Sequence, residues 1–414
     1  MKTRKQKLKI AIFHLGFFFS GGGEKLVLEE TAELVRRGHE VSLFAPVVDK
    51  ENCFPDLIKK VKVYSLFFPF SFNFPLRDFI SIIGAVFLTP LTFFRYARFD
   101  VFFGANQPGP LICFFLAKIL NKPYVIYLAQ PTRLLYPRQI DLEEGFGKGS
   151  FNIFYFLTQF IRPIVLFLDR ISIRKANAIL VNGNYMAGIL EKVYKIQVIV
   201  CPAGCHPREK LLNYQIRWQG QLNLNSKIIP KPFFLITNRH FPQKRLDYAI
   251  LALAEILKES VNVFLVITGA ATAYTKGLKN LVQKLDLEKN VIFTGLISEK
   301  ELLELYSQAV VYLYTSPEED FGMGVIEAMG AGIPVVAWDK GGPATTVLND
   351  KTGYLVKPYS QKEFTKKIYD LLMDKKKNFQ YGTNALSQVR RNFDYGRHND
   401  LVEKTLLKAV IKGR

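Results

Sequence analysis

Short apolar runs alternate with longer amphipathic stretches along both halves of the chain. Residues 8–14 (LKIAIFH) are typical of a buried strand. Residues 24–37 place apolar side chains at helical intervals and are followed by Gly38, a common helix stop. Further strands in the first half are predicted at 41–45, 61–66, 101–105, 124–129, 178–182 and 197–201. Runs made almost wholly of Val, Ile, Leu and Phe indicate a parallel sheet covered on both faces.

The alternation weakens over 205–231 and then starts again. The strands predicted in the second half are 233–237, 262–268, 290–295, 310–315 and 334–338. The whole pattern predicts an α/β protein of two doubly wound, Rossmann-like domains facing a cleft that holds ligand. We expect the first domain at 1–208 and the second at 209–393, with a last helix at 394–414 that packs back on the first.

Length and charge fit this picture. A chain of 414 residues is long enough for two cores. Residues 1–209 carry 27 basic and 16 acidic side chains (+11), and the rest carry 29 and 20 (+9), which together give +20. A nucleic-acid-binding tail would concentrate its charge. The even spread excludes nucleic acid as a partner and favours an anionic small substrate, an anionic membrane surface, or both.

Cysteine usage and the N-terminus indicate a cytoplasmic protein. Four cysteines in 414 residues make no disulfide framework. The segment CPAGCH (201–206) matches neither the spacing of a zinc site nor that of a haem attachment, so no metal is expected. The first residues resemble a signal peptide in charge, but their apolar stretch ends at His14 and continues into a glycine loop, which argues against secretion.

Phenylalanine is distributed unevenly, with 26 of 35 before residue 170. The run 79–94 has no charged residue, yet it is shorter than the ~20 residues that span a bilayer, and Pro90 interrupts it. Two interpretations are open: a buried or partly buried helix, and a helix lying in a membrane interface.

The segment 315–338 (TSPEEDFGMGVIEAMGAGIPVVAW) carries the most chemistry. A strand ends near Thr315, and Gly322 opens a helix behind an acidic turn. A helix N-terminus presents free N–H groups that suit a phosphate, and glycine lets the backbone approach it. Glu319 and Glu327 can both face one ligand. The same residues also fit an ordinary β–α–β unit whose acidic cap favours a helix N-terminus.

Glu319 and Glu327 have seven residues between them, inside E-D-F-G-x-x-x-x-E-A. This resembles the signature of the retaining glycosyltransferase family 4, which has the GT-B fold. The resemblance implies that Glu327 bonds the nucleotide ribose and that Glu319 faces the transferred sugar. Phe321, Gly322 and Met323 would lie against the sugar and phosphates of the donor.

Two cations follow the strand at 233–237. Arg239 and Lys244, in NRHFPQKRLD, are similar to the Arg and Lys with which the family clamps the donor diphosphate. Such cations neutralise the charge that accumulates on the leaving group. The family usually has glycine where this chain has Asn238 and Arg245.

A glycine loop follows the first strand. Residues 20–26 (SGGGEKL) resemble the Gly-Gly-x-Glu loop of the family, whose backbone faces the donor phosphates and the acceptor. Gly21, Gly22 and Gly23 would keep side chains away from the ligand, although a plain turn also fits. The loop lacks the G-x-G-x-x-G spacing of a dinucleotide site.

One position departs from the family. Many relatives carry a histidine near the reacting sugar at the end of the strand here at 124–129, and this chain has Gln130. Glutamine exchanges hydrogen bonds but does not carry a proton at neutral pH. We assign the catalytic places to Glu319, Arg239, Lys244 and Gln130. Acceptor recognition is expected in the loops 67–78 and 133–152, with Arg133 and Tyr136 as candidate contacts.

The resemblance implies a retaining hexosyltransferase with an N-terminal acceptor domain and a C-terminal donor domain. The turn GGP (341–343) is most similar to mannosyltransferase branches that use GDP-mannose. The expected reaction moves mannose from a nucleoside diphosphate sugar to a hydroxyl of a lipid-linked or polysaccharide acceptor, without metal or other cofactor. The expected location is cytoplasmic and peripheral on the inner membrane face.

Two alternatives are open. The first is a catalytically impaired nucleotide-sugar-binding or regulatory protein of the same fold, which Gln130 in place of the histidine suggests. The second is phosphorylase-like or synthase-like chemistry on glucan, which the short chain and the lack of a cofactor-lysine signature argue against.

Overall fold

The computed structural model describes residues 6–18, 21–66, 77–133, 135–144, 151–208, 215–224 and 227–413, without the side chains of 77–79, 143–144 and 151–161. The chain forms two compact units. The first comprises Met1–Arg138, Phe146–Ala203 and Gly396–Arg414, and the second comprises Gln139–Gly145 and Gly204–Tyr395. Residues 139–145 and 204–208 therefore group with the second unit, although the sequence placed them in the first. Of the expected acceptor loops, 67–76, 134 and 145–150 lie outside the described residues.

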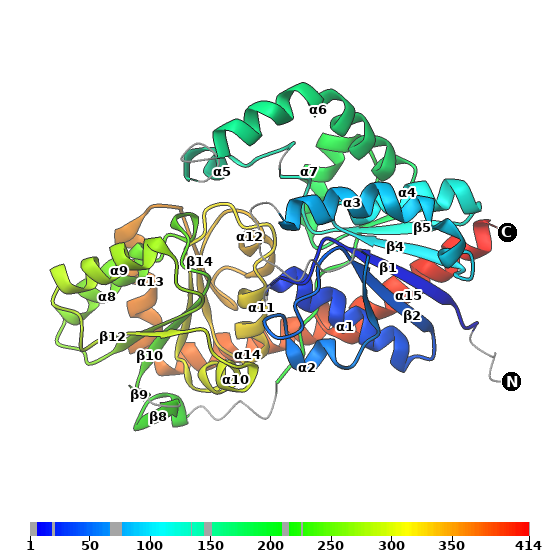
Figure 1. Ribbon diagram of the computed structural model, residues 1–414. Helices are drawn as coiled ribbons and strands as arrows, with labels where there is room; N and C mark the ends of the chain where they lie inside the picture. Colours follow the sequence, from blue (N-terminus) through cyan, green and yellow to red (C-terminus); the bar gives the residue numbers. More distant parts are fainter. Residues whose placement is uncertain are drawn as a thin grey trace, which may run out of the picture. The chain divides into compact units, whose positions relative to one another are not determined.

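The first unit is built on a parallel sheet in the order β3-β2-β1-β4-β5-β6-β7 (Figure 1). Its strands fall where the apolar runs predict them, because each run buries side chains on both faces of the sheet. The strands are β1 (Lys9–His14), β2 (Glu40–Ala45), β3 (Val63–Ser65), β4 (Val101–Ala105), β5 (Tyr124–Leu128), β6 (Ala178–Val181) and β7 (Ile199–Val200).

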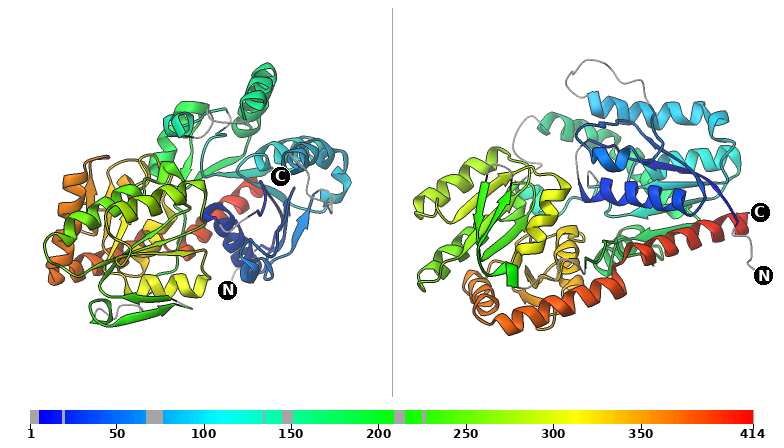
Figure 2. Two further views of the ribbon diagram at one scale, coloured as in Figure 1. Left: turned by 60° about the vertical axis from the view of Figure 1, so that its left-hand side comes forward. Right: turned by 90° about the horizontal axis from the view of Figure 1, so that it is seen from below.

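Helices cover both faces of this sheet (Figures 1 and 2). The helix predicted at 24–37 begins two residues earlier, because Gly22 and Gly23 already adopt helical geometry. The helical elements are α1 (Gly22–Arg36), α2 (Pro55–Ile58), α3 (Arg77–Leu91), η1 (Phe93–Tyr96), α4 (Gly109–Leu120), α6 (Phe151–Arg174), α7 (Asn184–Tyr194) and most of α15 (Tyr395–Gly413).

The second unit repeats the design with a parallel sheet in the order β12-β11-β10-β13-β14-β15. Two short strands that the sequence did not predict form an antiparallel pair in the region of weak periodicity, β8 (Gln221–Leu224) and β9 (Lys227–Pro230). The sheet strands are β10 (Phe233–Thr237), β11 (Phe264–Thr268), β12 (Val291–Gly295), β13 (Val311–Tyr314), β14 (Val335–Trp338) and β15 (Gly353–Val356).

Helices lie on both faces of the second sheet as well (Figure 2). Helices α9 and α10 start at capping boxes, where a Thr or Ser side chain and the third helical residue exchange hydrogen bonds. The helical elements are α5 (Gln139–Glu144), η3 (Gln215–Arg217), η4 (Pro242–Lys244), α8 (Asp247–Leu257), α9 (Ala273–Lys284), α10 (Glu299–Gln308), α11 (Met323–Gly330), α12 (Pro343–Thr346), α13 (Gln361–Met373) and α14 (Lys375–Asn392).

The strand order reverses once in each sheet, between β1 and β4 and between β10 and β13. Loops diverge at such a switch point, which leaves a crevice outside the carboxyl ends of the strands. The candidate donor residues follow β10 and β13, so chain topology alone brings them to one edge of the second sheet. These two parallel, doubly wound units confirm the predicted fold class.

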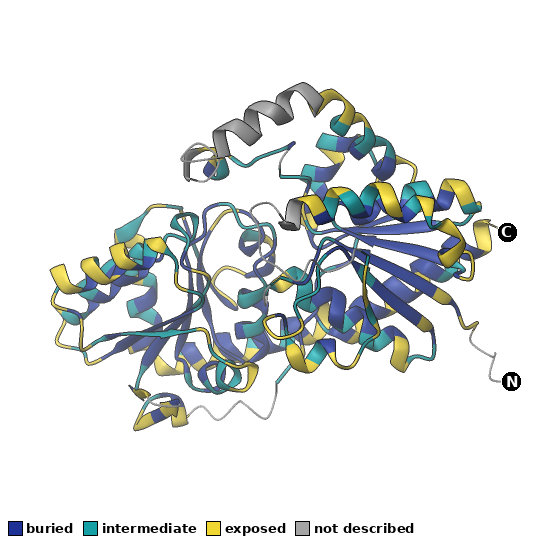
Figure 3. Ribbon diagram, viewed as in Figure 1, coloured by how far each residue is buried: buried dark blue, intermediate teal, exposed yellow. Residues whose placement is uncertain are grey.

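The core of each unit is the sheet with the helix faces packed on it (Figure 3). β4, β5, β11, β13 and β14 are buried along their whole length. In the second unit Trp338 is the largest fully buried side chain. Burial of such strands is the main favourable term that holds each unit together.

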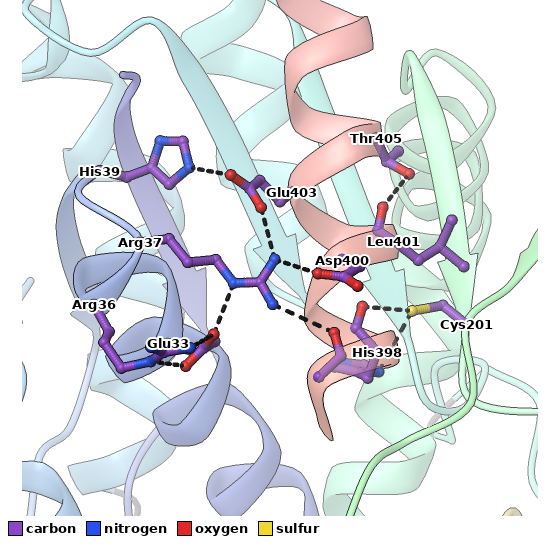
Figure 4. Close-up of polar contacts among 11 residues, drawn as sticks. Glu33, Arg36, Arg37, His39, Cys201, His398, Asp400, Leu401, Glu403 and Thr405 are labelled. Carbon is purple, nitrogen blue, oxygen red and sulfur yellow. Dashed lines mark hydrogen bonds and ion pairs between the residues drawn. The ribbon is translucent and has the colours of Figure 1, made fainter. Parts of the chain in front are cut away.

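Polar contacts with α1 and with Arg37, the residue after it, hold α15 on the first unit, and all of their side chains except that of Asp400 are largely buried (Figure 4). The guanidinium of Arg37 donates 2.6 Å hydrogen bonds to Glu403 and Asp400, and a 2.7 Å bond to Glu33. Beneath them His398 donates from Nε2 to Glu30 over 2.7 Å. Because these groups are far apart in sequence, they fix where the last helix docks.

Candidate active site

A lysine and a glutamate meet at the carboxyl edge of the second sheet. Lys244 ends η4 after β10, and Glu319 lies in the turn after β13. The Lys244 ammonium forms an ion pair with Glu319 Oε2. The Thr315 hydroxyl donates to the backbone oxygen of Lys244 over 2.8 Å, which fixes the loop that carries the lysine. The two residues that sequence reasoning placed on one donor are therefore in direct contact.

Tyr314 joins this pair and was missed in the sequence. Its hydroxyl donates to Glu319 Oε2 over 2.7 Å. Burial, together with the charge of Glu319, raises the pKa of Tyr314 well above its usual range, so the hydroxyl keeps its proton and remains a donor. The available signal was the alternation of Tyr312 and Tyr314 in a strand that otherwise reads as aliphatic.

Helix α11 starts directly beside the pair. Its N-cap, Gly322, has φ +87 and ψ 66, a left-handed conformation that costs side-chain-bearing residues free energy. Gly324 is required for space, because a Cβ there would lie 2.2 Å from the Tyr312 hydroxyl. The first N–H groups of the helix therefore open beside Glu319, and their partial positive charge suits a phosphate oxygen.

The other end of α11 is capped by a buried arginine. Arg217 donates from Nη1 to Gly332 O over 2.7 Å and from Nη2 to Ala331 O over 2.8 Å. It also donates to Ser307 O, near the end of α10, over 3.2 Å. Carbonyls at a helix C-terminus carry partial negative charge, so the cation stabilises the helix that bears the site.

Glu327 lies on α11 and accepts a 3.2 Å hydrogen bond at Oε2 from the Tyr306 hydroxyl. Thr237, the last residue of β10, links that tyrosine to Tyr312 by contacts of 3.2 and 2.6 Å. Burial raises the pKa of Tyr306 well above its usual range, with the charge of Glu327 contributing. These three hydroxyls support the carboxylate and, like Tyr314, were not foreseen.

The GGP turn has a structural role of its own. The Gly342 N–H donates to Glu319 O over 2.7 Å. A Cβ at Gly341 would lie 2.4 Å from Glu319 O, and one at Gly342 would lie 2.3 Å from the Phe321 Cα. Two glycines are therefore needed so that this turn can brace the backbone of the E-D-F-G loop.

Arg239 is exposed, and its guanidinium lies 5.2 Å over the ring of Phe241. The loop that carries it passes Gly269 so closely that a Cβ there would lie 2.0 Å from Asn238 O. His240 is buried, with Nδ1 3.0 Å from the Thr275 hydroxyl. Burial, together with the charge of Lys279, lowers the pKa of His240, so its ring is neutral at pH 7.

In the first unit, the glycine loop opens α1. Gly21 is the N-cap in extended backbone, and Gly22 and Gly23 are the first helical residues. A Cβ at Gly23 would meet no atom of the described chain within 4 Å. His14 precedes the loop, and burial lowers its pKa to about 4, so it is neutral at pH 7.

Gln130 follows β5, is exposed, and accepts a 3.3 Å hydrogen bond from Arg133 Nε. The neighbouring Ala129 is held from both sides, since its N–H donates to Asn106 and its carbonyl accepts from Asn182. Tyr136 accepts from Arg170 over 3.2 Å. The loop after β5 thus presents Gln130 from a fixed backbone.

Comparison with known proteins identifies the class. Residues 220–388 match the family model of glycosyl transferases group 1, and residues 20–208 match the model of glycosyltransferase family 4. Two solved structures show the same fold over nearly the whole chain. Sucrose-phosphate synthase from Thermosynechococcus elongatus has a TM-score of 0.75 at 18% identity, covering 98% of this chain and 100% of that one. HepE from Anabaena in complex with UDP has a TM-score of 0.72 at 18% identity, covering 97% and 100%.

The chain belongs to the GT-B glycosyltransferases of the family 4 type and is a hexosyltransferase. Several of its relatives bear the name of a mannosyltransferase. The alpha-1,3/1,6-mannosyltransferase alg2 of Schizosaccharomyces pombe is 27% identical, covering 89% of this chain and 74% of the relative. The Dictyostelium discoideum protein of that name is 26% identical, covering 95% and 97%.

In the part of the chain that the structure describes, no helix is long and apolar enough to cross a membrane.

Proposed function

We propose that this hexosyltransferase moves mannose from GDP-mannose to a hydroxyl of a lipid-linked or polysaccharide acceptor, with retention of the anomeric configuration. Two relatives named as mannosyltransferases support the mannosyl assignment, and their similarity extends over 89% and 95% of this chain. The GGP turn at 341–343 supports GDP-mannose as the donor.

The observation that carries the proposal is the contact between Lys244 and Glu319 beside the N-terminus of α11. It joins a cation and a helix N-terminus, which both suit a diphosphate, to a carboxylate placed for a sugar hydroxyl. In the proposed complex Lys244 and Arg239 contact the diphosphate. Glu327, held by Tyr306, bonds the ribose, and Glu319, held by Tyr314, bonds the mannose.

In the proposed step the acceptor oxygen attacks C1 of mannose on the face that the diphosphate leaves. The bond between C1 and the phosphate oxygen breaks, and its electron pair goes to GDP. The departing phosphate oxygen takes the proton of the acceptor hydroxyl, so the products are GDP and the mannoside. The residues then act by stabilising the leaving group rather than as the paired carboxylates of glycoside hydrolysis.

We further propose that the two cations neutralise the diphosphate without a divalent metal. Transfer should then be unchanged when the protein is assayed in excess EDTA. An activity lost in EDTA and restored by Mg²⁺ or Mn²⁺ would contradict this part of the proposal while leaving the donor assignment intact.

Gln130 favours a second candidate, a nucleotide-sugar-binding protein that has lost transfer. It is exposed after β5, where many relatives carry a histidine, and it cannot accept a proton at neutral pH. The two candidates differ in one measurement. The regulatory protein would bind the donor but release no nucleoside diphosphate with any member of a broad acceptor panel.

The test is a nucleotide-sugar panel scored by thermal shift and by nucleoside diphosphate release. GDP-mannose should give the largest thermal shift, and GDP release should require an acceptor. Lys244→Ala should lower turnover by about a hundred-fold, the usual loss for one transition-state donor. Glu327→Ala should lower transfer by weakening the binding of GDP-mannose, which would appear as a smaller thermal shift and a raised KM. Lys258→Ala, which removes an exposed cation paired with Glu255 in the same unit, should leave turnover unchanged. Full transfer by both site variants would show that the reaction occurs elsewhere.

A further inference from the structure

Helix α3 and the turn η1 are amphipathic in the wrong sense for a surface helix of a water-soluble domain. In α3 the buried positions are small or polar and lie one turn apart, Ser81, Ala85 and Thr89, whereas η1 anchors its end of the segment by burying Tyr96 in the core. The outward positions recur at helical spacing and are large and apolar: Ile80, Ile83, Phe87, Leu91 and Phe94. Three of these side chains are largely exposed, Phe87 at 66%, Leu91 at 70% and Phe94 at 66%. A surface helix normally turns its apolar stripe toward the core.

Helix α6 shows the same inversion. Ile164 and Phe167 are each 63% exposed, whereas Asp169 is buried and accepts hydrogen bonds from Thr132 over 2.6 Å and Gln107 over 3.0 Å. Both α3 and α6 pack against α4. Helices α3, α4 and α6 therefore lie side by side on one face of the first sheet (Figure 1), and each carries some of the large exposed apolar side chains.

We call this surface the apolar face and define it by Ile80, Ile83, Phe87, Leu88, Leu91, Phe93, Phe94, Ile119, Ile164 and Phe167. Single exposed apolar side chains are common, but a set carried by helices that pack against one another is typical of an interaction site. Because polar groups are buried beneath it, the set does not arise from an incomplete core.

The charge around the apolar face indicates what covers it. Residues 79–99 contain Arg95 and Arg98 and no acidic residue, within a chain of net charge +20. Both arginines are exposed directly after Phe94. Apolar side chains bordered by cations match the boundary between acyl chains and anionic headgroups. With 15 residues, α3 is about 22 Å long, short of the ~30 Å hydrocarbon core, so it would lie along the interface.

We propose that the apolar face docks the first unit onto an anionic lipid membrane, with α3 and η1 inserted at the headgroup–acyl boundary. The role that this docking serves, delivery of a lipid-linked acceptor hydroxyl, rests on the proposed function. The docking itself does not, because no residue of the apolar face belongs to the donor site.

The test compares wild-type protein with the triple variant Phe87→Ser, Leu91→Ser, Phe94→Ser in vesicle co-sedimentation. The probes are vesicles of phosphatidylcholine alone and of phosphatidylcholine mixed with phosphatidylglycerol. A large apolar side chain that is fully transferred contributes roughly one to two powers of ten to a partition constant. Three half-inserted side chains should therefore make the triple variant bind about a hundred-fold more weakly. Wild-type binding should need the anionic lipid and weaken in high salt.

The matched control removes three exposed apolar side chains elsewhere: Ile228→Ser, Met373→Ser, Ile411→Ser. It should bind vesicles as the wild type does. Thermal shift with GDP-mannose, measured on every variant, shows whether the fold and the donor site are intact. A proposed function that fails would show in this shift, whereas a docking proposal that fails would show only with vesicles.

Three outcomes would overturn the docking proposal. Wild-type protein could fail to sediment with anionic vesicles even at low salt, or the triple variant could bind as tightly as wild type. Alternatively, sedimentation velocity could show that wild type self-associates and the triple variant does not, without vesicle binding by either. That result would assign the apolar face to a second copy of the chain.

Discussion

The buried pair of Glu30 and His398 allows a sharp test of what holds α15 on the first unit. Both side chains are buried, and His398 donates from Nε2 to Glu30 over 2.7 Å and from Nδ1 to Pro202 O over 2.8 Å. A carbonyl oxygen can only accept, so Nδ1 carries a hydrogen. A carboxylate accepts likewise, so Nε2 carries the second one, and the ring is a cation. The perturbation we choose is Glu30→Gln, which keeps the shape and removes the charge.

The magnitude follows from the pKa of His398. Burial disfavours the charged ring, but the hydrogen bonds to Cys201 and Glu30 and their charges outweigh it and raise the pKa from 6.5 to about 10. A pKa that is higher in the folded protein stabilises it fully below the unfolded value, and this stability is lost as pH rises through the folded value. One pKa unit corresponds to about 1.4 kcal/mol, so the full contribution is roughly 5 kcal/mol.

The assay is urea unfolding of the full chain across about pH 6.5 to 9, comparing wild type with Glu30→Gln. The wild type should be more stable near pH 6.5, and its advantage should shrink by about 1.4 kcal/mol per pH unit as pH rises, because unfolding then releases the proton that folded His398 still holds. Hydrogen exchange in α15 provides a local readout of the same loss. The control Glu40→Gln removes a carboxylate that is 50% exposed, and its difference from wild type should not vary with pH in this way. A Glu30→Gln difference that stays constant across the range would refute the charged pair.

Three further predictions concern the sites themselves. Gly23→Ala should fold normally yet lower turnover at least about tenfold, because in the proposed complex the donor phosphates occupy the open space at its Cβ. The helical control Gly188→Ala should be silent, and equal activity would assign Gly23 to a plain turn. Arg217→Met should lower the free energy of unfolding by about 3–5 kcal/mol, because three buried carbonyls lose their donor. Urea titration measures this loss, and a value below about 1 kcal/mol would show that other groups cap α11. Gly342→Ala should weaken the GDP-mannose thermal shift because its Cβ forces the turn away from Phe321, and an unchanged shift would mean that the turn does not support the donor loop.

Much of the site follows from order along the chain. Lys244 comes after one predicted strand and Glu319 after another, and parallel strands with a single switch point bring such ends to the same edge. The glycine at 322 could also be anticipated, since a helix that starts in left-handed backbone favours that residue. Their roles toward a donor remain predictions.

The supporting groups could not be found in this way. Tyr306, Tyr314 and Thr237 read as helix or strand residues, and only packing turns their hydroxyls toward the two glutamates. Arg217 lies in a stretch with little periodicity, and nothing local indicates that it caps α11. A residue that acts through a distant partner leaves no spacing in the sequence.

For the run at 79–94, too, the sequence predicts the element and packing decides its orientation. Its composition permitted a buried or partly buried helix, or an interfacial one, and the structure shows a partly buried helix on which Phe87, Leu91 and Phe94 are exposed. Periodicity gives the helix and its two faces, but both faces are uncharged, so hydropathy alone does not say which one packs. Contact with α4 decided that, by placing Ser81, Ala85 and Thr89 inside.

By itself the sequence determined the fold class, the strands of the first sheet, all strands of the second sheet except β15, and the motifs of a family 4 glycosyltransferase. These depend on local periodicity and on residue types at short spacing, which are written along the chain. The tertiary structure decided how Lys244 pairs with Glu319, how Glu30 holds His398, and which face of α3 is exposed. The two pairs join residues 75 and 368 positions apart, and the exposed face of α3 depends on its contact with α4. All three depend on how whole elements pack, because burial and charge act through space.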